Sequence, residues 1–138
     1  KNGEWLVVAD GEPTVSGRLV IFDTKTWERI ETIRAHGDSI YGLTTSPDGK
    51  LLATASADKL AKLWEIGSWK SKGSLEGHTE YVMAAAFSPD GERIATAGAD
   101  AFIKAWKVKT LKEFSTFSGR QAKLPKTDLV WTLMPTKE

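Results

Sequence analysis

The sequence contains no cysteine and only two histidines among its 138 residues. Without cysteine the protein can form no disulfide, thiolate metal site, iron–sulfur cluster or cysteine nucleophile, and the redox compartment stays open. Two histidines without a cluster of further ligands make a poor zinc site, and no Cys-x-x-Cys-His segment is present for haem attachment. The sequence therefore predicts neither a metal nor a cofactor.

An excess of one charge and a long apolar run are also missing. Nineteen basic and eighteen acidic residues give a formal net charge of +1 at pH 7, which provides no field to attract nucleic acid or an anionic membrane. The longest apolar run, Val82 to Phe87, is far shorter than the roughly 20 residues that span a bilayer. The N-terminus lacks a signal-peptide pattern. We expect a soluble protein without a membrane partner, with the cytoplasm as the favoured compartment.

What the sequence does contain is a repeat with a period of 42 residues. A repeat of this length indicates an array of small supersecondary units, each of which needs its neighbours to bury its apolar faces. The landmarks of the first copy are His36, Ser46-Pro-Asp-Gly49, Thr54, Asp58 and Trp64, and those of the second are His78, Ser88-Pro-Asp-Gly91, Thr96, Asp100 and Trp106.

Each copy holds four short apolar or alternating runs bounded by turn residues, the pattern of antiparallel strands. No segment has the pattern of a helix. We expect strands at 40–45, 51–56, 60–66 and 70–75 in the first copy and at 81–87, 93–97, 102–108 and 111–117 in the second. Outside the two copies we expect strands at 4–9, 18–23, 28–34 and 129–134, a breaker-rich loop at 11–17 and a basic loop at 120–126.

On these residues the chain resembles the WD-repeat β-propeller family. In that family a Gly-His pair opens the unit and a Trp-Asp pair closes its third strand. The pairs here are Ala35-His36 and Gly77-His78, then Trp64-Glu65 and Trp106-Lys107, with Phe22-Asp23 in a degenerate first unit. The resemblance covers almost the whole chain and implies an all-β fold made of β-propeller blades, each a four-stranded antiparallel sheet.

The strand order predicts one domain over residues 1–138 with about three blades. We expect a partial blade at 4–34, complete blades at 36–75 and 78–117, and a first strand at 128–134 that completes a further blade. Because propellers commonly close with about 4–8 blades, ring closure needs other chains or missing sequence. The start at Lys1 favours an excerpt of a longer propeller, whereas the complementary strand phase favours assembly, for instance as a six-bladed homodimer.

The recurring polar residues have a physical explanation. A buried histidine can donate one ring N–H to an aspartate and accept a hydrogen bond from a hydroxyl at its other nitrogen, and an indole N–H extends such a network. Tight-turn chemistry explains Asp48 and Asp90. We therefore expect two structural networks, formed by His36, Thr54, Asp58 and Trp64 and by His78, Thr96, Asp100 and Trp106.

Candidate binding residues follow from the resemblance, because family members contact partners along the narrow upper rim of the propeller. The matching positions are Ser39, Tyr41 and Ala57 in one blade and Tyr81, Met83 and Ala99 in the next. Tyrosine and methionine suit an adaptable contact surface, and packing between blades is the alternative role of Tyr41 and Met83. A six-residue insertion at 11–16 adds Glu12 and Thr14 to the rim candidates, with a solvated loop as the alternative.

These patterns predict a non-catalytic scaffold that binds proteins through its upper rim. No phosphate-binding glycine loop, nucleophile elbow or convergent carboxylate pair supports an enzyme. Two alternatives stay open: an accessory propeller of a larger enzyme or redox complex, and a self-assembling structural ring with no other partner. The expected partners are proteins or further copies of the chain. The basic loop at 120–126 lacks interleaved aromatic residues, so nucleic acid is not expected.

Overall fold

A computed structural model of the chain describes residues 3–118, and the predicted basic loop and final strand lie outside these residues. Every secondary-structure element within residues 3–118 is a β-strand, which confirms the all-β prediction. The described part of the chain contains no helix that could cross a membrane. The strands are β1 (Trp5–Glu12), β2 (Ser16–Asp23), β3 (Arg29–His36), β4 (Ile40–Thr45), β5 (Leu51–Ser56), β6 (Ala61–Glu65), β7 (Ser71–Leu75), β8 (Val82–Phe87), β9 (Arg93–Gly98), β10 (Phe102–Lys107) and β11 (Lys112–Ser118).

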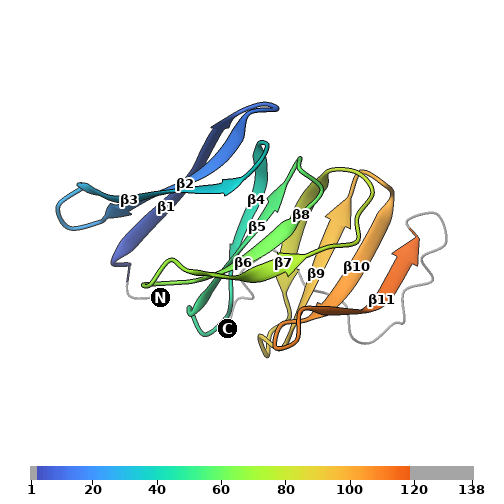
Figure 1. The fold of residues 1–138 in the computed structure, drawn as a ribbon. Coiled ribbons are helices and arrows are strands. Elements are labelled where there is room, and N and C mark those ends of the chain that lie inside the picture. The colour runs from blue at the N-terminus through green and yellow to red at the C-terminus, as the bar shows by residue number, and fades with distance from the viewer. Residues whose placement is uncertain (1–2, 119–138) are drawn as a thin grey trace, which may run out of the picture.

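The strands form three antiparallel sheets that follow one another along the chain. The first has the order β1-β2-β3, the second β4-β5-β6-β7 and the third β8-β9-β10-β11. The sheets stand side by side with their strands in similar orientation, as Figure 1 shows. Strand β4 contacts β1 on one side and β8 on the other. The sheets of residues 3–118 do not close into a ring, so this part of the chain is an open array of propeller-type sheets.

The turns repeat with the same period as the sequence. The backbone φ angle is 73° at Gly49 and 72° at Gly91, the last residues of the two Pro-Asp-Gly turns. Glycine is favoured in this left-handed conformation. Asp48 Oδ1 accepts hydrogen bonds from the Ser46 hydroxyl at 2.6 Å and from the backbone N–H of Lys50 at 3.0 Å. The turn role expected for Asp48 therefore has a direct geometric basis.

One sequence expectation about the first sheet was wrong. The segment 11–17 was expected to be a loop, yet β1 and β2 stay paired through Gly11↔Gly17 to Glu12↔Ser16, and only residues 13–15 form the turn. Two facing glycines allow this close pairing, because a Cβ on Gly11 would lie 2.1 Å from the backbone oxygen of Ser16. Sixteen positions separate the paired residues Leu6 and Phe22, against twelve between Leu52 and Trp64. The insertion is therefore a hairpin extension of four residues rather than a loop of six.

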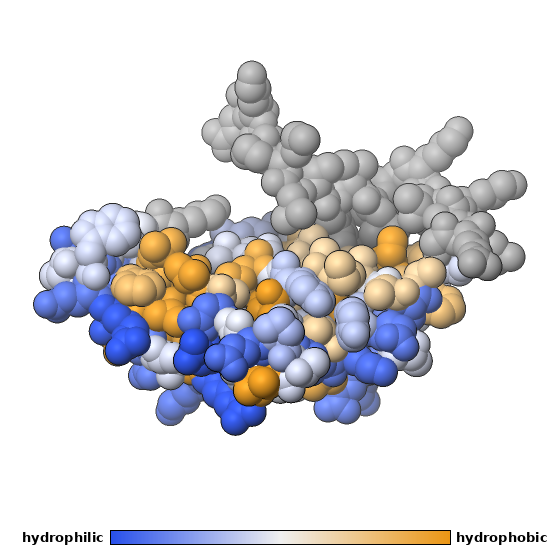
Figure 2. Space-filling model, turned by 90° about the horizontal axis from the view of Figure 1, so that it is seen from above, coloured by the Kyte–Doolittle hydropathy of each residue, from blue (hydrophilic) through white to orange (hydrophobic). Residues whose placement is uncertain are grey.

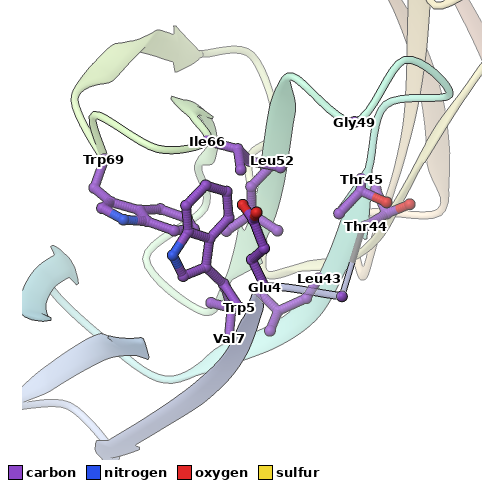
Figure 3. Close-up of a pocket in the computed structure, with 11 residues that line it drawn as sticks. Glu4, Trp5, Val7, Leu43, Thr44, Thr45, Gly49, Leu52, Ile66 and Trp69 are labelled. Carbon is purple, nitrogen blue, oxygen red and sulfur yellow. The ribbon is translucent and has the colours of Figure 1, made fainter. Parts of the chain in front are cut away.

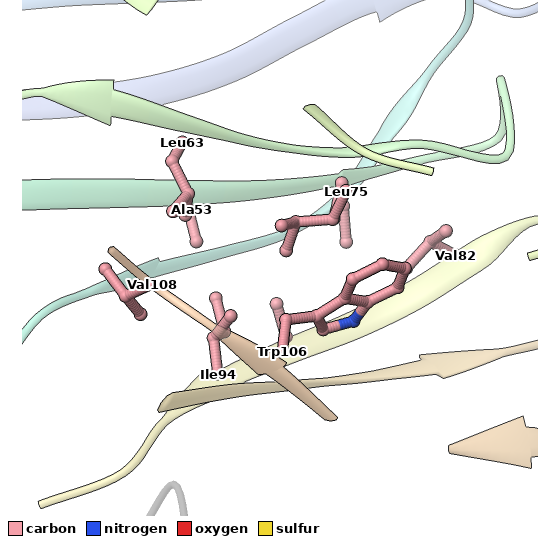
Figure 4. Packing of buried hydrophobic residues seen from close by; sticks show 10 residues of the cluster. Ala53, Leu63, Leu75, Val82, Ile94, Trp106 and Val108 are labelled. Atoms are coloured by element: carbon pink, nitrogen blue, oxygen red, sulfur yellow. The ribbon is translucent and has the colours of Figure 1, made fainter. Parts of the chain in front are cut away.

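Two apolar clusters fill the gaps between the sheets. The cluster between the first and second sheets includes Leu19, Ile21, Leu52 and Trp64. The cluster between the second and third includes Leu63, Leu75, Val82, Ile94 and Trp106, which point toward one another in Figure 4. Alternate residues of β5 face opposite clusters, as the period of a strand requires. The second sheet is therefore covered on both faces by its neighbours.

Candidate functional site

Each of the second and third sheets contains a chain of buried hydrogen bonds between four side chains. In the second sheet the Nδ1 atom of His36 lies 2.9 Å from Asp58 Oδ2, and its Nε2 lies 2.6 Å from Thr54 Oγ1. The indole N–H of Trp64 donates to the same Thr54 oxygen at 3.1 Å. The structure thus brings together all four residues of the first expected network.

The third sheet repeats this geometry. His78 Nδ1 lies 2.9 Å from Asp100 Oδ2, and its Nε2 lies 2.8 Å from Thr96 Oγ1. Trp106 donates to Thr96 at 2.9 Å. The first sheet has no such chain, because Phe22 occupies the tryptophan position and Val8, opposite Val20, occupies the threonine position.

The surroundings of Asp58 favour its charged form. Burial opposes ionisation of this carboxyl group, but hydrogen bonds from His36 and from the backbone N–H groups of Gly37 and Leu60 outweigh that effect and lower its pKa to about 2. The pKa of Asp100 is also lowered, since His78, Thr79 and Phe102 supply the same donors against the effect of burial. Both aspartates are therefore anions that hold their histidines and the adjoining loops in place.

An Asp-His-Thr chain has the order of a catalytic triad, in which a histidine accepts the proton of a nucleophilic hydroxyl. Here the threonine side chains are closed off from any substrate, because Thr54 is 0% and Thr96 is 1% exposed. Each hydroxyl oxygen also accepts an indole N–H, which occupies the atom that would attack. No group of three or more potential metal ligands occurs within residues 3–118. The arrangement holds the sheet and the connection before it together.

The exposed candidates lie where β4 and β8, the first strands of the second and third sheets, are irregular. In β4 the pairing shifts between Ile40 and Gly42, and in β8 it shifts between Val82 and Ala84. The residues inside these β-bulges are Tyr41 and Met83, whose side chains are 49% and 48% exposed. A bulge redirects a side chain away from the regular pleat and is common beside binding sites. The 42-residue repeat therefore places an exposed, bulky side chain at the same point of both inner strands.

Tyr81 joins this pair. It is 46% exposed, and its ring lies 6.3 Å from the ring of Tyr41, measured between centroids, across the gap between the second and third sheets. We call Tyr41, Tyr81 and Met83 the aromatic rim cluster. Figure 2, which looks at this end of the sheets from above, shows apolar side chains gathered along one side of the arc and hydrophilic side chains along the other.

The remaining rim candidates are placed less favourably for contact. The backbone N–H of Ala57 donates to the Ser39 carbonyl at 2.9 Å, and that of Ala99 donates to the Tyr81 carbonyl at 2.8 Å, so each pair lies at one end of its sheet. Ser39 is half-buried and Ala99 is exposed. Ala57 is only 5% exposed, so its expected place on an accessible rim was wrong. Its turn is covered by the connection between β3 and β4, to which it is hydrogen-bonded.

The hairpin candidates, Glu12 and Thr14, are exposed but anchored. The backbone N–H of Thr14 donates to Asp38 Oδ1 at 2.7 Å, and the guanidinium of Arg34 donates to the Val15 carbonyl at 3.0 Å. The first bond ties the turn of the β1–β2 hairpin to the connection that enters the second sheet, and the second ties it to β3 of its own sheet. The hairpin is therefore part of the upper rim, which we define by the connections β1–β2, β3–β4, β5–β6, β7–β8 and β9–β10.

Sequence reasoning missed a cavity at the opposite end of the sheets. Its lining includes Trp5 at the start of β1, Glu4 directly before it, and Trp69 in the β6–β7 turn. One signal was present in the sequence, since Trp27 and Trp69 are 42 residues apart and both have φ near 57° in equivalent turns. The partner of Trp69 could not be found by spacing, because Trp5 precedes the repeat.

Comparison with known proteins agrees with this architecture. The family model described as WD domain, G-beta repeat matches residues 27–65 and 69–107, more than half of the chain. Each matched unit begins at the tryptophan in the turn before an outer strand and ends with the third strand of the following sheet. A matched unit therefore spans two neighbouring sheets, so consecutive sheets are linked by every repeat.

The similar curated proteins share single segments with this chain. WD repeat-containing protein 1 from Gallus gallus is 38% identical over 58 residues, covering 40% of this chain and 10% of that protein. The p21-activated protein kinase-interacting protein 1-like from Danio rerio is 36% identical over 50 residues, or 36% and 14% of the two chains. Protein hir1 from Schizosaccharomyces pombe is 34% identical over 61 residues, or 44% and 6%. The chain matches only a small part of the length of these relatives.

Proposed function

Because this chain belongs to the WD40 repeat family, we propose that it is a non-catalytic scaffold that binds a protein partner at its upper rim. The observation that carries the proposal is the aromatic rim cluster. Tyr41 and Met83 are turned outward by equivalent bulges, and Tyr81 joins them across the gap between two sheets. Two tyrosines and a methionine provide the large, adaptable contact area that is enriched in protein interfaces.

The rigidity of the surrounding residues supports the same role. The two Asp-His-Thr-Trp networks lie directly below the rim and fix the connections that enter β4 and β8. A contact surface held in one conformation loses little side-chain and loop entropy when a partner binds. The Danio rerio relative is named as a kinase-interacting protein, which agrees with an interaction role for this chain without identifying its partner.

A quantitative capture experiment tests the proposal. The tagged chain and its triple variant Tyr41→Ser, Tyr81→Ser, Met83→Ser are used as baits in an extract of the source cells, and bound proteins are quantified by mass spectrometry. A matched control is Phe114→Ser on β11, because Phe114 is as exposed as Tyr81, at 46%. We expect one or more proteins to bind the parent chain and the control, and to be recovered in at least about tenfold smaller amounts with the rim variant. A tenfold loss corresponds to removing an interface hot spot of roughly 1.4 kcal/mol.

The candidate partner is then purified and titrated against the three baits. Equal affinity of the partner for the parent chain and the rim variant contradicts the proposal. The proposal is also contradicted if both baits capture the same proteins in the same amounts. Thermal unfolding of each bait separates loss of a contact from loss of the fold, since these exposed side chains contribute little to the core.

A second candidate function, assembly of a ring, is supported by the first sheet. It has three strands where the other two sheets have four, and β1 occupies the position that β5 and β9 hold as the second strands of their sheets. Strand β1 is therefore an edge within residues 3–118, and a groove beside it is lined by Val7, Ala9, Ile40 and Leu43. An open edge of this kind is a template for another strand. We propose that a further strand, from another copy or from sequence beyond 3–118, completes this sheet.

Light scattering after size exclusion tests ring assembly. A stable dimer or trimer that dissociates when β1 is blocked, for example by Val8→Pro, supports assembly from several copies. A monomer that folds and stays monomeric at high concentration contradicts assembly from several copies, and leaves sequence beyond 3–118 as the source of the completing strand. The capture experiment decides the rim proposal separately, because Tyr81 and Met83 do not line the groove beside β1, whereas Tyr41 does.

A further inference from the structure

The cavity at the end opposite the upper rim has the composition of a binding site. It has a volume of about 520 Å³ and lies between the start of β1, the end of β4 and the turn that joins β6 to β7. This volume is in the range of small-ligand pockets, about 300–1,000 Å³. Two indoles, one carboxylate and several aliphatic side chains line it, as Figure 3 shows: Glu4, Trp5, Val7, Leu52, Ile66 and Trp69.

The two tryptophans form adjacent walls of the cavity. Their rings lie 5.7 Å apart between centroids and are inclined by 84°, an edge-to-face pair. Trp5 remains 37% exposed although it packs against the neighbouring sheet. At the equivalent turn of the third sheet Leu111 fits closely against Gly73, where an added Cβ would lie 2.4 Å from a Leu111 methyl carbon. The second sheet therefore keeps an open aromatic corner where the third sheet is closed.

Glu4 supplies a negative charge beside this corner. Its side chain is half-buried, and in Figure 3 its carboxylate faces the same space as the two indoles. Within residues 3–118 this carboxylate makes no ion pair or side-chain hydrogen bond, and both indoles and aliphatic side chains share the lining with Thr44 and Thr45. A carboxylate in such surroundings is stabilised by a cation, and an aromatic face also attracts a cation.

We propose that this pocket binds an alkylated ammonium cation carried on a narrow aliphatic chain, as in a trimethylated lysine side chain. Methyl groups on nitrogen spread the positive charge over an apolar surface that fits into the corner formed by Trp5 and Trp69 and needs no hydrogen-bond acceptor. A primary ammonium brings three donors, whereas Glu4 is the charged acceptor of the lining. The aliphatic stem can pack on Val7 and Leu52, and an anionic ligand is repelled by Glu4.

Calorimetric titration of the complete chain with matched peptides tests this site. The probes are one short, uncharged peptide carrying trimethyl-lysine, the same peptide with lysine, and the same peptide with the neutral tert-butyl isostere of trimethyl-lysine. The isostere keeps the shape and removes the charge, so it isolates the cation–π and ionic contributions. We expect the trimethylated peptide to bind about three- to thirtyfold more tightly than the isostere, the range that cation–π contacts provide, and more tightly than the unmodified peptide.

Variants assign the binding to this pocket. Trp5→Leu and Glu4→Gln are each expected to weaken binding of the trimethylated peptide at least about threefold. Trp27→Leu is the matched control, because Trp27 occupies the equivalent turn of the first sheet, is 67% exposed and has no indole partner among residues 3–118. If Trp5→Leu lowers the unfolding midpoint, Glu4→Gln still decides the question, since it changes one charge and no shape.

Comparing the affinity of choline with that of the trimethylated peptide identifies the source of the cation. Choline that binds as tightly as the peptide indicates a free small cation, and a tighter peptide indicates a protein side chain; either result supports the site. Equal affinities for the cation and its isostere overturn the proposal, as does binding that Glu4→Gln and Trp5→Leu leave unchanged. Adsorption to phosphatidylcholine vesicles without saturable binding of choline or peptide also overturns it.

Discussion

The second and third sheets have nearly the same hydrogen-bond network but very different coverage. The second lies between two neighbours, and five of the six residues of β5 are buried. In β9, its counterpart in the third sheet, only Ile94 and Thr96 are buried. Yet the ring nitrogens of His36 and His78 lie at similar distances from their partners. The network is thus a property of the single repeat, whereas apolar burial depends on the neighbouring repeat.

The two networks differ in one detail that shows how tightly they are built. Ser56 in the second sheet donates to the Ser39 carbonyl at 2.9 Å and accepts from the Asp58 N–H at 3.2 Å. Gly98 takes the same place in the third sheet, where an added Cβ would lie 2.4 Å from His78 Nδ1. The Asp100 side chain is correspondingly less exposed than that of Asp58, at 3% against 16%. One sheet secures its loop with a hydroxyl, and the other with a more enclosed histidine–aspartate hydrogen bond.

The largest effect is expected from Trp106→Ala. Trp106 is 2% exposed, fills the gap between the second and third sheets and donates to Thr96. Its truncation removes both the local network and the apolar contact with the neighbour, so the free energy of unfolding should fall by about 3–5 kcal/mol. Urea denaturation followed by circular dichroism measures this loss. A loss as small as that of an exposed residue, such as Phe114→Ala, would show that the two sheets do not stabilise each other.

Removal of the aspartates comes next and separates the two networks. We expect Asp100→Ala and Asp58→Ala to lower the unfolding free energy by roughly 1.5–3 kcal/mol, the contribution of a hydrogen bond to a charged group. Asp100→Ala should be the more costly because its site is more enclosed. Asp48→Ala removes a carboxylate that accepts two hydrogen bonds in an exposed turn, and so compares an exposed site with the two enclosed ones. An unchanged thermal midpoint in both network variants would contradict the stabilising role of the histidine–aspartate pairs.

Acid should weaken the second sheet over a defined range of pH. The pKa of Asp58 is lowered from 3.8 to about 2 in the folded chain. The stability that its charge contributes is therefore complete above about pH 4 and is lost as the pH falls toward 2. Thermal midpoints measured from pH 5 to pH 2 should fall less steeply for Asp58→Asn than for the parent chain. Parallel curves would show that Asp58 ionises in the same way in the folded and unfolded chains.

Exchanging the residue that differs between the networks sharpens the comparison. We expect Gly98→Ser to cost about 1–3 kcal/mol, because the new Cβ is forced against His78 and Asp100. Ser56→Gly should cost about 1 kcal/mol, since it removes the hydrogen bonds of one hydroxyl. Chemical denaturation of the two single variants gives the order. If Gly98→Ser is the milder change, the third network is less tightly packed than its distances indicate.

The parts of this structure that the sequence predicted are those fixed within one repeat. The bounds of β4 and β5 agree with the expectation, because Pro-Asp-Gly turns and alternating residues define them locally. The β1–β2 hairpin was mistaken for a loop because its glycines act as breakers unless they face each other across a strand pair. The burial of Ala57 and the Trp5–Trp69 contact depend on segments far away in the sequence. Periodicity within a repeat carries no information about such contacts.

The smallest effect concerns the junction between the first and second sheets, which has a contact that the next junction lacks. Asp38 Oδ1 accepts the backbone N–H groups of Thr14 and Ser39 at 2.7 and 2.6 Å. We expect Asp38→Ala to cost about 0.5–1.5 kcal/mol and to speed hydrogen exchange at the Thr14 amide, while Asp38→Asn, which keeps an acceptor oxygen, should restore much of the protection. Unchanged exchange at Thr14 in Asp38→Ala would mean that Arg34 and the strand pairing alone fix the hairpin. Its position on the rim would then be set by the first sheet rather than by its neighbour.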